Sequence, residues 1–418
     1  MTRSEQKVAM ASPPPRPPLS RFERQRERIL DAATMLLNQR GVAGMTLQEV
    51  AEQLGLKTTA VTYYFRYKEQ LITAVFEDSL TRLKAMADEA AKAATPRQRV
   101  DRYLQIYFAH YAAGLRGETR PLAILSEIRA LENDARSHLI ARYQSIFRLV
   151  RAFFGPTDTP EQKLTLTARA QMLNEAIFWS AIWLKHYEIA DFDNVRRQFM
   201  QILDGGIAGT PDNIELPPLR STTRVDAGDS YASFLKIATR LLNEVGYKGT
   251  SIDRIAAELN LTKGSFYHHL PTKDDLILQC FENSYKRLWE LYEQATQARL
   301  SKWHTLISII ANAMKYQFEG DYPLLRTTAL QALPDNVRHI PYEHFQSTTL
   351  FLTGLIVDAC GEGAVRNINP LIASHIIMST INSAFDIRSW AAKQDMEQAV
   401  DTYLQGITHG IFDPAQPA

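Results

Sequence analysis

Apolar residues recur at the spacing of an amphipathic helix along two stretches of this chain that lie far apart. In the first stretch, a helix is predicted from about Arg21 to Gln39, because an apolar residue returns every third or fourth position. Gly41 follows, a residue type that commonly ends a helix because it accepts a positive φ. The apolar residues that define the predicted face are Phe22, Ile29, Ala33, Leu36 and Leu37.

The same pattern returns in the second half of the chain. Residues Ile29–Glu77 and Phe234–Glu282 align without a gap, so that Gly41 falls on Gly246. A stretch rich in Pro, Ser and Thr, from Thr210 to Ser230, separates the two copies and shows no helical period, which is typical of a linker. The chain is therefore predicted to consist of two repeated modules.

Each copy is predicted to begin with three helices. Thr46 has a glutamate three residues later and so forms a capping box for the second helix, whereas Ser251 has an arginine there and caps alone. A tight turn follows at Gly55 or Asn260, the two residue types that best tolerate a positive φ. This is the pattern of a helix-turn-helix. The residues expected on the buried face of the second helix are Val50, Ala51 and Leu54, and then Ile255, Ala256 and Leu259.

The predicted third helix is short, Thr58–Phe65 in the first copy and Lys263–Leu270 in the second. Its outward face is polar and aromatic, as a helix that docks into a DNA groove requires. A fourth helix is expected to begin at Lys68 and at Lys273, the latter behind a capping box that starts at Thr272.

At these residues the chain resembles the TetR family of bacterial repressors. The stretch TLQEVAEQLGLKTTAVTYYFRYKEQL looks like that family's helix-turn-helix and the start of its connecting helix. The stretch TSIDRIAAELNLTKGSFYHHLPTKDDL matches it independently. Outside the repeated stretches, each half resembles the family only in being helical.

The resemblance implies an all-α fold in which each TetR-like module has a three-helix DNA-binding domain and a C-terminal helical bundle for ligand binding and dimerisation. It further implies that the last two helices of each bundle pair with a partner as a four-helix interface. The candidates are Leu164–Tyr187 and Asn194–Ile207 in the first half, and Pro370–Ala392 and Met396–Ile411 in the second.

Two positions depart from the family pattern. Thr62 stands where the family usually has a phosphate-contacting tyrosine, although Tyr63 and Tyr64 follow it. The second copy has Tyr267 at that place, but Leu270 replaces the usual phenylalanine. The two copies are therefore expected to read different bases.

The place of each residue on the motif assigns its expected contact with DNA. The residues expected to contact phosphates are Thr46, Lys57, Tyr64, Lys68, Ser251, Tyr267 and Lys273. The residues expected to reach base edges in the major groove are Thr58, Thr59, Thr62, Tyr63, Lys263, Gly264, Ser265 and His268. For Tyr64 and Phe266, a place in the core is the alternative.

Positive charge is concentrated at these motifs, although the net charge of the whole chain is only +1. Residues 57–68 contain three basic and no acidic side chains, and residues 262–273 contain two basic and none acidic. Such segments are attracted to phosphates. Over a longer span the second copy is balanced, with seven basic and seven acidic residues at 224–275, against eleven and seven at 1–70.

Composition is that of an ordinary soluble protein, with 45% hydrophobic and 22% charged residues among 418, a length that favours more than one domain. The most apolar segment, Ala176–Leu184, is about half as long as a membrane span. Residues 12–18 are proline-rich rather than an apolar signal sequence. Cys280 and Cys360 lack CxxC partners and are expected in the core. We expect a cytoplasmic, nucleoid-associated bacterial protein without cofactor or metal.

The domain boundaries follow from the repeat and the linker. We expect a disordered proline-rich N-terminus at 1–20, the first helix-turn-helix domain at 21–67, the first C-terminal bundle at 68–209, the linker at 210–226, the second helix-turn-helix domain at 227–272, and the second bundle at 273–418.

Family members usually release DNA when a small molecule fills the C-terminal bundle, so an apolar effector is expected. The aromatic residues that could line its pocket are Tyr103, Tyr107, Tyr111, Phe178, Trp179 and Trp183 in the first half, and Trp303, Tyr316, Phe318, Phe385 and Trp390 in the second. Aromatic residues at helical spacing also fit a plain core, which is the alternative.

The sequence does not favour an enzyme. Gly361 and Gly363 lack the third glycine of a dinucleotide fingerprint, and no GxSxG or Walker motif occurs. The histidines show no metal-ligand spacing with nearby carboxylates. The alternative to a DNA-binding regulator is a ligand sensor or protein-interaction scaffold in which one module has lost DNA binding.

The two predicted recognition helices differ, TTAVTYY against KGSFYHH, and this difference bears on assembly. A homodimer presents two identical helices and reads a palindrome. Two different helices in one chain would read double-stranded DNA with non-identical half-sites. We therefore expect an intramolecular pseudo-dimer, with a homodimer as the alternative.

Overall fold

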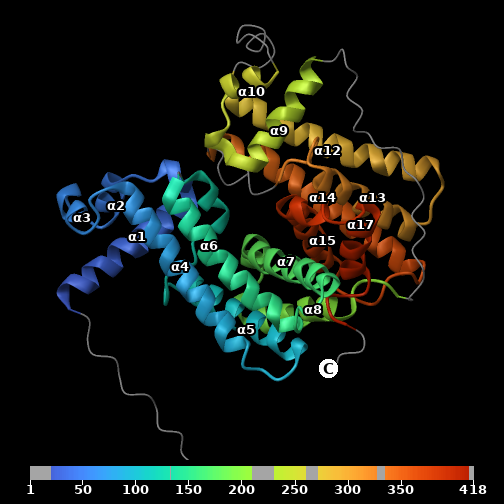
Figure 1. Ribbon diagram of the computed structural model, residues 1–418, viewed down its shortest axis with the longest axis horizontal. Coiled ribbons are helices and arrows are strands. Elements are labelled where there is room, and N and C mark those ends of the chain that lie inside the picture. Colours follow the sequence, from blue (N-terminus) through green and yellow to red (C-terminus); the bar gives the residue numbers. More distant parts are fainter. Residues whose placement is uncertain (1–19, 132, 210–229, 260–271, 327–334, 414–418) are drawn as a thin grey trace, which may run out of the picture.

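In the computed structural model, the described residues are 20–131, 133–209, 230–259, 272–326 and 335–413 (Figure 1). Within these ranges the fold is all-α, as predicted, and extended structure is limited to one isolated bridge between Ala208 and Val365. Figure 1 shows the first module in blue to green and the second in yellow to red, in contact along α7, α8, α15 and α17.

The first module runs from α1 to α8. Its helices are α1 (Arg21–Gly44), α2 (Leu47–Gln53), α3 (Thr58–Tyr64), α4 (Lys68–Ala90), α5 (Pro96–Leu115), η1 (Leu125–Ala130), α6 (Asn133–Arg151), η2 (Ala152–Phe154), α7 (Pro160–Trp183), η3 (Leu184–His186), η4 (Ile189–Asp191) and α8 (Phe192–Gly205).

The second module repeats this order. Its described helices are α9 (Ser230–Gly249), α10 (Ile252–Glu258), α12 (Lys273–Gln297), α13 (Lys302–Glu319), α14 (Asp335–Gly361), α15 (Pro370–Ala384), η6 (Phe385–Ile387), α16 (Arg388–Ala391) and α17 (Met396–Thr408). The recognition helix predicted at Lys263–Leu270, with the turn at Asn260, lies outside the described residues.

Local signals in the sequence set the ends of the first helices in both modules. Gly41 and Gly246 have φ angles of 68° and 72° and interrupt α1 and α9 at matching places. The capping boxes predicted at Thr46 and Thr272 are present, and Ser251 caps α10 without one. The two copies therefore keep the same backbone although many side chains differ.

The core of the DNA-binding units follows the predicted pattern with one correction. Ile29, Ala33 and Leu37 are buried on α1, but Phe22 is 49% exposed. Phe22 lies at the free end of α1, beyond the reach of the core, and stacks on Tyr64 with ring centroids 4.6 Å apart. The apolar spacing placed Phe22 in the core, whereas the structure places it against α3.

The four helices predicted to form an interface pack together within the one chain. α15 lies against α7 and α8, and α17 also contacts both. The rings of Trp183 and His375 stack with centroids 5.0 Å apart, and the Trp390 indole N–H donates to the Leu164 carbonyl at 2.9 Å. The helix predicted at Pro370–Ala392 is divided, because α15 ends at Ala384 and η6 and α16 follow.

The ends of α8 and α17 form reciprocal backbone hydrogen bonds. The Ile207 N–H donates to the Ile407 carbonyl at 3.0 Å, and the Ile411 N–H donates to the Leu203 carbonyl at 2.8 Å. Each bond is the counterpart of the other if the two modules are exchanged. This is the self-complementary contact of a twofold-symmetric dimer, formed here within a single polypeptide.

Glycine is required where these two ends cross. A Cβ atom on Gly206 would lie 2.2 Å from the Thr408 carbonyl group, and one on Gly410 would lie 2.3 Å from the Asp204 oxygen. The backbones of the two modules therefore approach too closely for any side chain. A glycine at the matching position of each half keeps the interface symmetric.

Candidate DNA-binding surface and intermodule cavity

The first DNA-binding unit presents α3 at its outer surface. Thr58 and Thr59 are exposed, and the Tyr63 ring is 76% exposed. Thr62 is half-buried, and its hydroxyl donates to the Thr59 carbonyl at 3.1 Å. Tyr64 is half-buried against Phe22. The residues expected to reach bases thus lie on one accessible face of a helix held by its opposite side.

The residues expected to contact phosphates flank α3. Lys57 is exposed just before the helix, and Lys68 is half-buried at the first position of α4. The Thr46 hydroxyl serves as the cap of α2, where it accepts from the Glu49 N–H at 3.2 Å. Its side chain is therefore engaged with the start of α2.

The start of α1 lies beside α3, which was not part of the sequence-based site. Phe22 packs on both Tyr63 and Tyr64, and the Arg26 guanidinium lies 5.5 Å from the centre of the Phe65 ring. These contacts bring the basic start of α1 next to the recognition helix. The exposed basic residues there are Arg21, Arg24 and Arg28. The run RFERQRER was the signal that could have identified them.

The second DNA-binding unit is described in part. Ser251 is exposed at the start of α10, where its hydroxyl accepts from the Arg254 N–H at 3.1 Å. Lys273 is half-buried at the first position of α12. The other residues assigned to DNA in this copy lie outside the described residues: Lys263, Gly264, Ser265, Tyr267 and His268.

An asparagine joins each DNA-binding unit to its bundle. Asn38 donates to the Leu122 carbonyl at 2.9 Å and accepts from the Ile124 N–H at 3.0 Å. Asn243 makes the same pair of bonds, to Leu324 at 2.9 Å and from Arg326 at 3.0 Å. The segment after α5 or α13 is therefore fixed to the first helix of each module.

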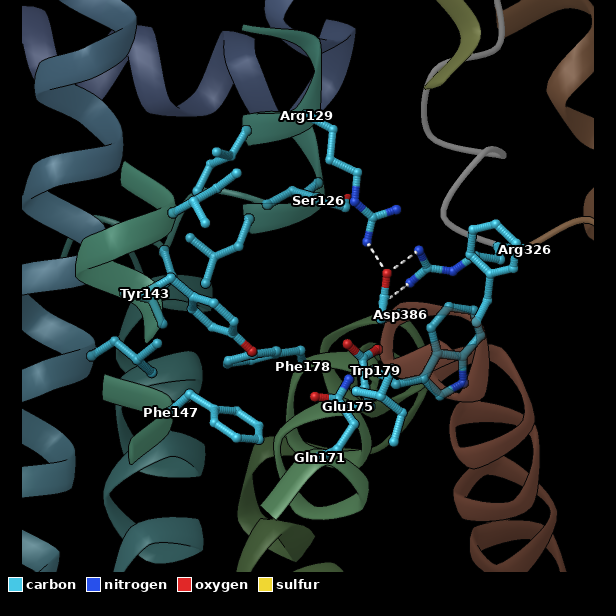
Figure 2. Close-up of a pocket in the computed structure, with 18 of the residues that line it drawn as sticks. Ser126, Arg129, Tyr143, Phe147, Gln171, Glu175, Phe178, Trp179, Arg326 and Asp386 are labelled. Carbon is cyan, nitrogen blue, oxygen red and sulfur yellow. Dashed lines mark hydrogen bonds and ion pairs between the residues drawn. The ribbon is translucent and has the colours of Figure 1, made fainter. Parts of the chain in front are cut away.

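A cavity of about 1750 Å³ lies between the two modules, and we call it the intermodule cavity. Helices α4 to α7 and η1 line it from the first module. Residues of α9, α14, η6 and α16, together with Arg326, line it from the second. Figure 2 shows its aromatic side, with Tyr143 and Phe147, facing a charged side with Asp386 and Arg326.

The aromatic residues expected to line a pocket fall into two groups. Those at the intermodule cavity are Tyr107, Tyr111, Phe178, Trp179, Phe385 and Trp390. Those outside its lining are Tyr103, Trp183, Trp303, Tyr316 and Phe318. The second group packs in the core; Tyr103, for example, is fully buried with its ring centre 5.7 Å from that of Phe153.

A charged cluster crosses the cavity from one module to the other. Asp386 accepts from the Arg326 Nη1 at 2.8 Å and from the Arg129 Nη2 at 2.9 Å (Figure 2). Glu175 faces this cluster from α7. Burial and the nearby Asp386 carboxylate raise the pKa of Glu175 to about 7, while Arg326 and Arg129 act in the opposite direction.

The short helix η1 contacts both DNA-binding units. The Glu127 carboxylate accepts from the Val42 N–H at 2.8 Å, at the end of α1. Arg129 reaches the Asn243 carbonyl on α9 at 3.5 Å. η1 also lines the intermodule cavity. One segment therefore connects the wall of the cavity with both units.

Metal-binding clusters and membrane-spanning helices are both absent from the described ranges. These ranges contain no group of His, Cys, Asp or Glu side chains arranged to hold a metal ion. None of their helices is both long enough and apolar enough to cross a bilayer. Cys280 is buried and Cys360 half-buried, and both are free thiols.

Comparison with protein families identifies the repeated stretches. The family described as "Bacterial regulatory proteins, tetR family" matches residues 29–75 and again residues 234–280. The two matches coincide with the two DNA-binding units derived above.

Curated relatives are transcriptional regulators. HTH-type transcriptional regulator BetI of Rhizobium meliloti is 34% identical over 85 residues, 20% of this chain and 42% of that protein. The Tn10 TetC protein of Escherichia coli is 29% identical over 96 residues, 23% of this chain and 48% of that protein. These matches span less than half the length of either relative. The fatty acid metabolism regulator protein of Bacillus subtilis is 20% identical over 189 residues, which cover 44% of this chain and 96% of that protein.

Solved structures give weaker similarities. AibR, in complex with isovaleryl coenzyme A and operator DNA, is 18% identical with a TM-score of 0.36 and covers 43% of this chain and 97% of its own. PfmR of Thermus thermophilus is 22% identical with a TM-score of 0.34 and covers 42% and 96%. The family matches and the repeated fold agree: this chain carries two tandem domains of the tetR family of bacterial regulatory proteins.

Proposed function

We propose that the protein is a sequence-specific DNA-binding transcriptional regulator that acts as an intramolecular pseudo-dimer on an operator with non-identical half-sites. The reciprocal hydrogen bonds between the ends of α8 and α17 carry this proposal, because they complete within one chain the symmetric contact that a dimer makes between two. Its place of action would be the bacterial nucleoid.

The arrangement of the DNA-binding units supports the proposal. Figure 1 shows α1–α3 and α9–α10 at the periphery, both away from α8. The exposed threonines and Tyr63 of α3 suit contacts with base edges, and the basic start of α1 suits contacts with phosphates. Because the second copy carries a different recognition sequence, the two half-sites would differ.

We further propose that a ligand in the intermodule cavity releases the protein from DNA, which would make it a ligand-responsive repressor. The cavity is bordered by Asn38 and Asn243, which fix the two DNA-binding units to their bundles, and by η1, which contacts both units. A ligand that displaces η1 would change the spacing of the units, and the spacing of half-sites on a duplex is fixed.

The mass of the free protein tests the pseudo-dimer. Light scattering should give the mass of one chain, 47.4 kDa, because the interface is already complete within it. A particle of twice that mass that persists on dilution would show that each half pairs with another copy.

Selection from a random DNA pool tests the operator. The recovered sequences should contain two different half-sites about one or two helical turns apart. Recovery of perfect palindromes would contradict the proposal, because a palindrome needs two identical recognition helices.

A second candidate function is a sensor or scaffold in which only one module binds DNA, and the balanced charge of the second copy favours it. The matched substitutions Lys68→Ala and Lys273→Ala separate the two functions. If both modules bind, each should weaken binding and reduce the salt slope by about one unit. If only Lys68→Ala has this effect, the second module is an interaction domain. Lys315→Met, an exposed change on α13, serves as the control.

A further inference from the structure

One face of α6 lines the intermodule cavity with apolar and basic residues. Ile140, Tyr143, Phe147 and Arg151 follow at spacings of three and four residues, and all four line the cavity. Residues at this spacing share one face of a helix. The wall formed by α6 therefore offers an apolar surface between two cations, Arg136 at one end and Arg151 at the other.

The facing stripe on α7 also has a basic residue at the α6–α7 turn and an apolar residue further from it. Lys163, Thr167, Gln171, Glu175 and Phe178 line the cavity at spacings of three and four residues. From Lys163 to Phe178 the stripe extends for about 22 Å. The space between the two stripes is thus elongated, with one basic end at the α6–α7 turn.

Three basic residues line the cavity at that end, with Lys163 and Lys393 exposed and Arg151 half-buried. The Arg151 Nη1 donates to the Thr167 hydroxyl at 3.3 Å, one turn from Lys163 on the same face of α7. Lys393 is brought there by Trp390, whose indole donates to the Leu164 carbonyl at 2.9 Å. In the part of the chain that the structure describes, no acidic residue forms an ion pair with any of the three cations.

Buried hydrogen-bond donors inside the cavity lack acceptors. The Trp179 Nε1 and the Arg326 Nε are buried without a hydrogen bond to any described residue, and both residues line the cavity. Buried donors are almost always paired in proteins, so an unpaired donor in a cavity wall indicates a place for an acceptor on a ligand.

The acids of the lining are already paired or beside arginines. The described acidic residues of the lining are Glu175, Glu244 and Asp386. Glu244 pairs with Arg388 at 3.3 Å, and Asp386 is shared by two guanidinium groups. Glu175 lies close to that cluster, and its raised pKa leaves it partly protonated at neutral pH. The cavity therefore has excess positive charge. Arg151, Lys163 and Lys393 supply part of it at the α6–α7 turn, and Arg136 and Lys185 supply part of it towards the other end of the two helices.

We propose that the intermodule cavity binds one elongated amphipathic anion per chain, with its apolar part along Tyr143, Phe147 and Phe178 and its anionic head group at Arg151, Lys163 and Lys393. The chemistry is that of a long alkyl or acyl chain that ends in a carboxylate or a phosphate. The inference deepens the proposed ligand response and rests on it only for the effect on DNA, because binding can be measured without DNA.

Four probes with one chain length and different head groups test the class of ligand. The full-length protein is titrated with myristate, tetradecyl phosphate, tetradecyltrimethylammonium and tetradecanol, and binding is followed by calorimetry and by the fluorescence of Trp179 and Trp390. Both anions should bind with one site per chain, and the ammonium should bind at least about tenfold more weakly. Tighter binding of the carboxylate would indicate a fatty acid, and tighter binding of the phosphate would indicate a phosphate ester.

Either of two results would overturn the inference. If the ammonium binds as tightly as the anions, the site is one for cations, with aromatic rings and Glu175 as its ligands. If neither anion binds, the cavity does not accept this class of molecule.

Matched variants test the position of the head group. Arg151→Met and Lys163→Met keep the length of the side chain and remove its charge, so each should weaken myristate binding about fivefold to tenfold. Lys315→Met removes an exposed positive charge outside the cavity and should leave binding unchanged. Thermal melting confirms that each variant is folded. Unchanged affinity in both cavity variants would show that the head group does not lie at this end.

The test separates this inference from the proposed function. Myristate binding that leaves operator affinity unchanged would support the site and contradict ligand release. If titration with myristate abolishes operator binding, and does so equally in the Lys315→Met control, both the binding site and the proposed ligand release are supported.

Discussion

The junctions between the DNA-binding unit and the bundle use the same hydrogen bonds in the two modules but opposite charges. Asn38 and Asn243 make identical pairs of bonds. Beside the first junction, Asp31 on α1 pairs with Arg120, whereas beside the second, Lys236 on α9 pairs with Asp321. The neutral bonds fix the geometry and are retained, while the sign of the charge pair is free to reverse.

The modules also differ in how they neutralise a buried arginine. Arg120, with a side chain 2% exposed, is held by three carboxylates: Glu27, Asp31 and Asp78. Arg326, equally buried, has one carboxylate ion-pair partner among the described residues, Asp386, which it shares with Arg129 of the first module. Arg120 therefore pairs within one module, whereas the carboxylate that holds Arg326 also pairs with Arg129 of the other module.

The largest expected effect comes from removing the single partner of Arg326. Asp386→Asn keeps the shape of the side chain but leaves a buried guanidinium without a counter-charge, so unfolding should require about 3 kcal/mol less free energy. Denaturant unfolding measures it. Asp31→Asn removes one of three partners of Arg120 and should cost about 1 kcal/mol or less. Equal costs would show that the two clusters are equivalent.

A gain of stability is expected from Glu175→Gln at high pH. The unfolded chain releases this proton near the ordinary pKa of 4.5, whereas the folded protein holds it to about pH 7. The folded state thus binds more protons between these values, and its stability falls as pH rises through this window. At pH 8 the variant should be more stable by about 2 kcal/mol, and at pH 4 the difference should vanish. Urea denaturation measures the free energy of unfolding at both pH values. A difference between the variant and the wild type that is the same at pH 8 and at pH 4 would contradict this account.

That result would sharpen the contrast between the facing helices. α7 carries Glu175 into the cavity, whereas α15 contains no Asp, Glu, Lys or Arg in its sequence, PLIASHIIMSTINSA. The ionisable side chain of α15 is His375, whose pKa burial lowers to about 4. Above about pH 5 this histidine is neutral, so the pH dependence there should follow changes on α7.

Comparable losses of stability are expected when either of the two junction asparagines is replaced. Asn243→Ala removes two hydrogen bonds and leaves the Leu324 carbonyl and the Arg326 N–H unpaired, which should cost about 2 kcal/mol. Asn38→Ala should cost slightly less, because Asn38 is half-buried whereas Asn243 is 3% exposed. Hydrogen exchange should show the loosened unit in each variant. A cost in one module alone would break the equivalence of the junctions.

The smallest effect is expected at the reversed charge pair. Asp321 is largely exposed, so Lys236→Met should change the free energy of unfolding by about 0.5 kcal/mol at most. Unfolding at low and high salt measures it. A cost near that of Asp386→Asn would mean that the charge pair, and not the asparagine, fixes the second junction.

Much of the local structure could be predicted because its causes lie within a few residues. The capping residues Thr46, Ser251 and Thr272 and the glycines at 41 and 246 each act on the turn that contains them. The resemblance to the TetR family indicated the helices of the interface to within a few residues, apart from the break after Ala384. The prediction that Phe22 is buried was wrong, because helical spacing does not distinguish a core residue from one that makes a contact at a helix end.

The candidate sites were predicted unequally. The face of α3 follows from its sequence, but the basic start of α1 joins it only because Phe22 packs on the recognition helix. The sequence indicated aromatic residues that could line a pocket, and six of them line the intermodule cavity, but it did not show that the cavity lies between the modules. The aromatic residues of the cavity resemble those of the core, and nothing in the spacing separates Phe178, which lines the cavity, from Trp183, which packs on His375.

The sequence by itself determined the repeat, the two helix-turn-helix units and the caps of their helices, because these depend on short-range periodicity and on hydrogen bonds between neighbours in the chain. Tertiary structure alone decided which charges meet. Arg129 and Asp386 are 257 residues apart in sequence yet share a hydrogen bond at 2.9 Å, and the cavity exists because two bundles pack against each other. Contacts between distant segments depend on the folded path of the backbone, which a pattern of neighbouring residues does not encode.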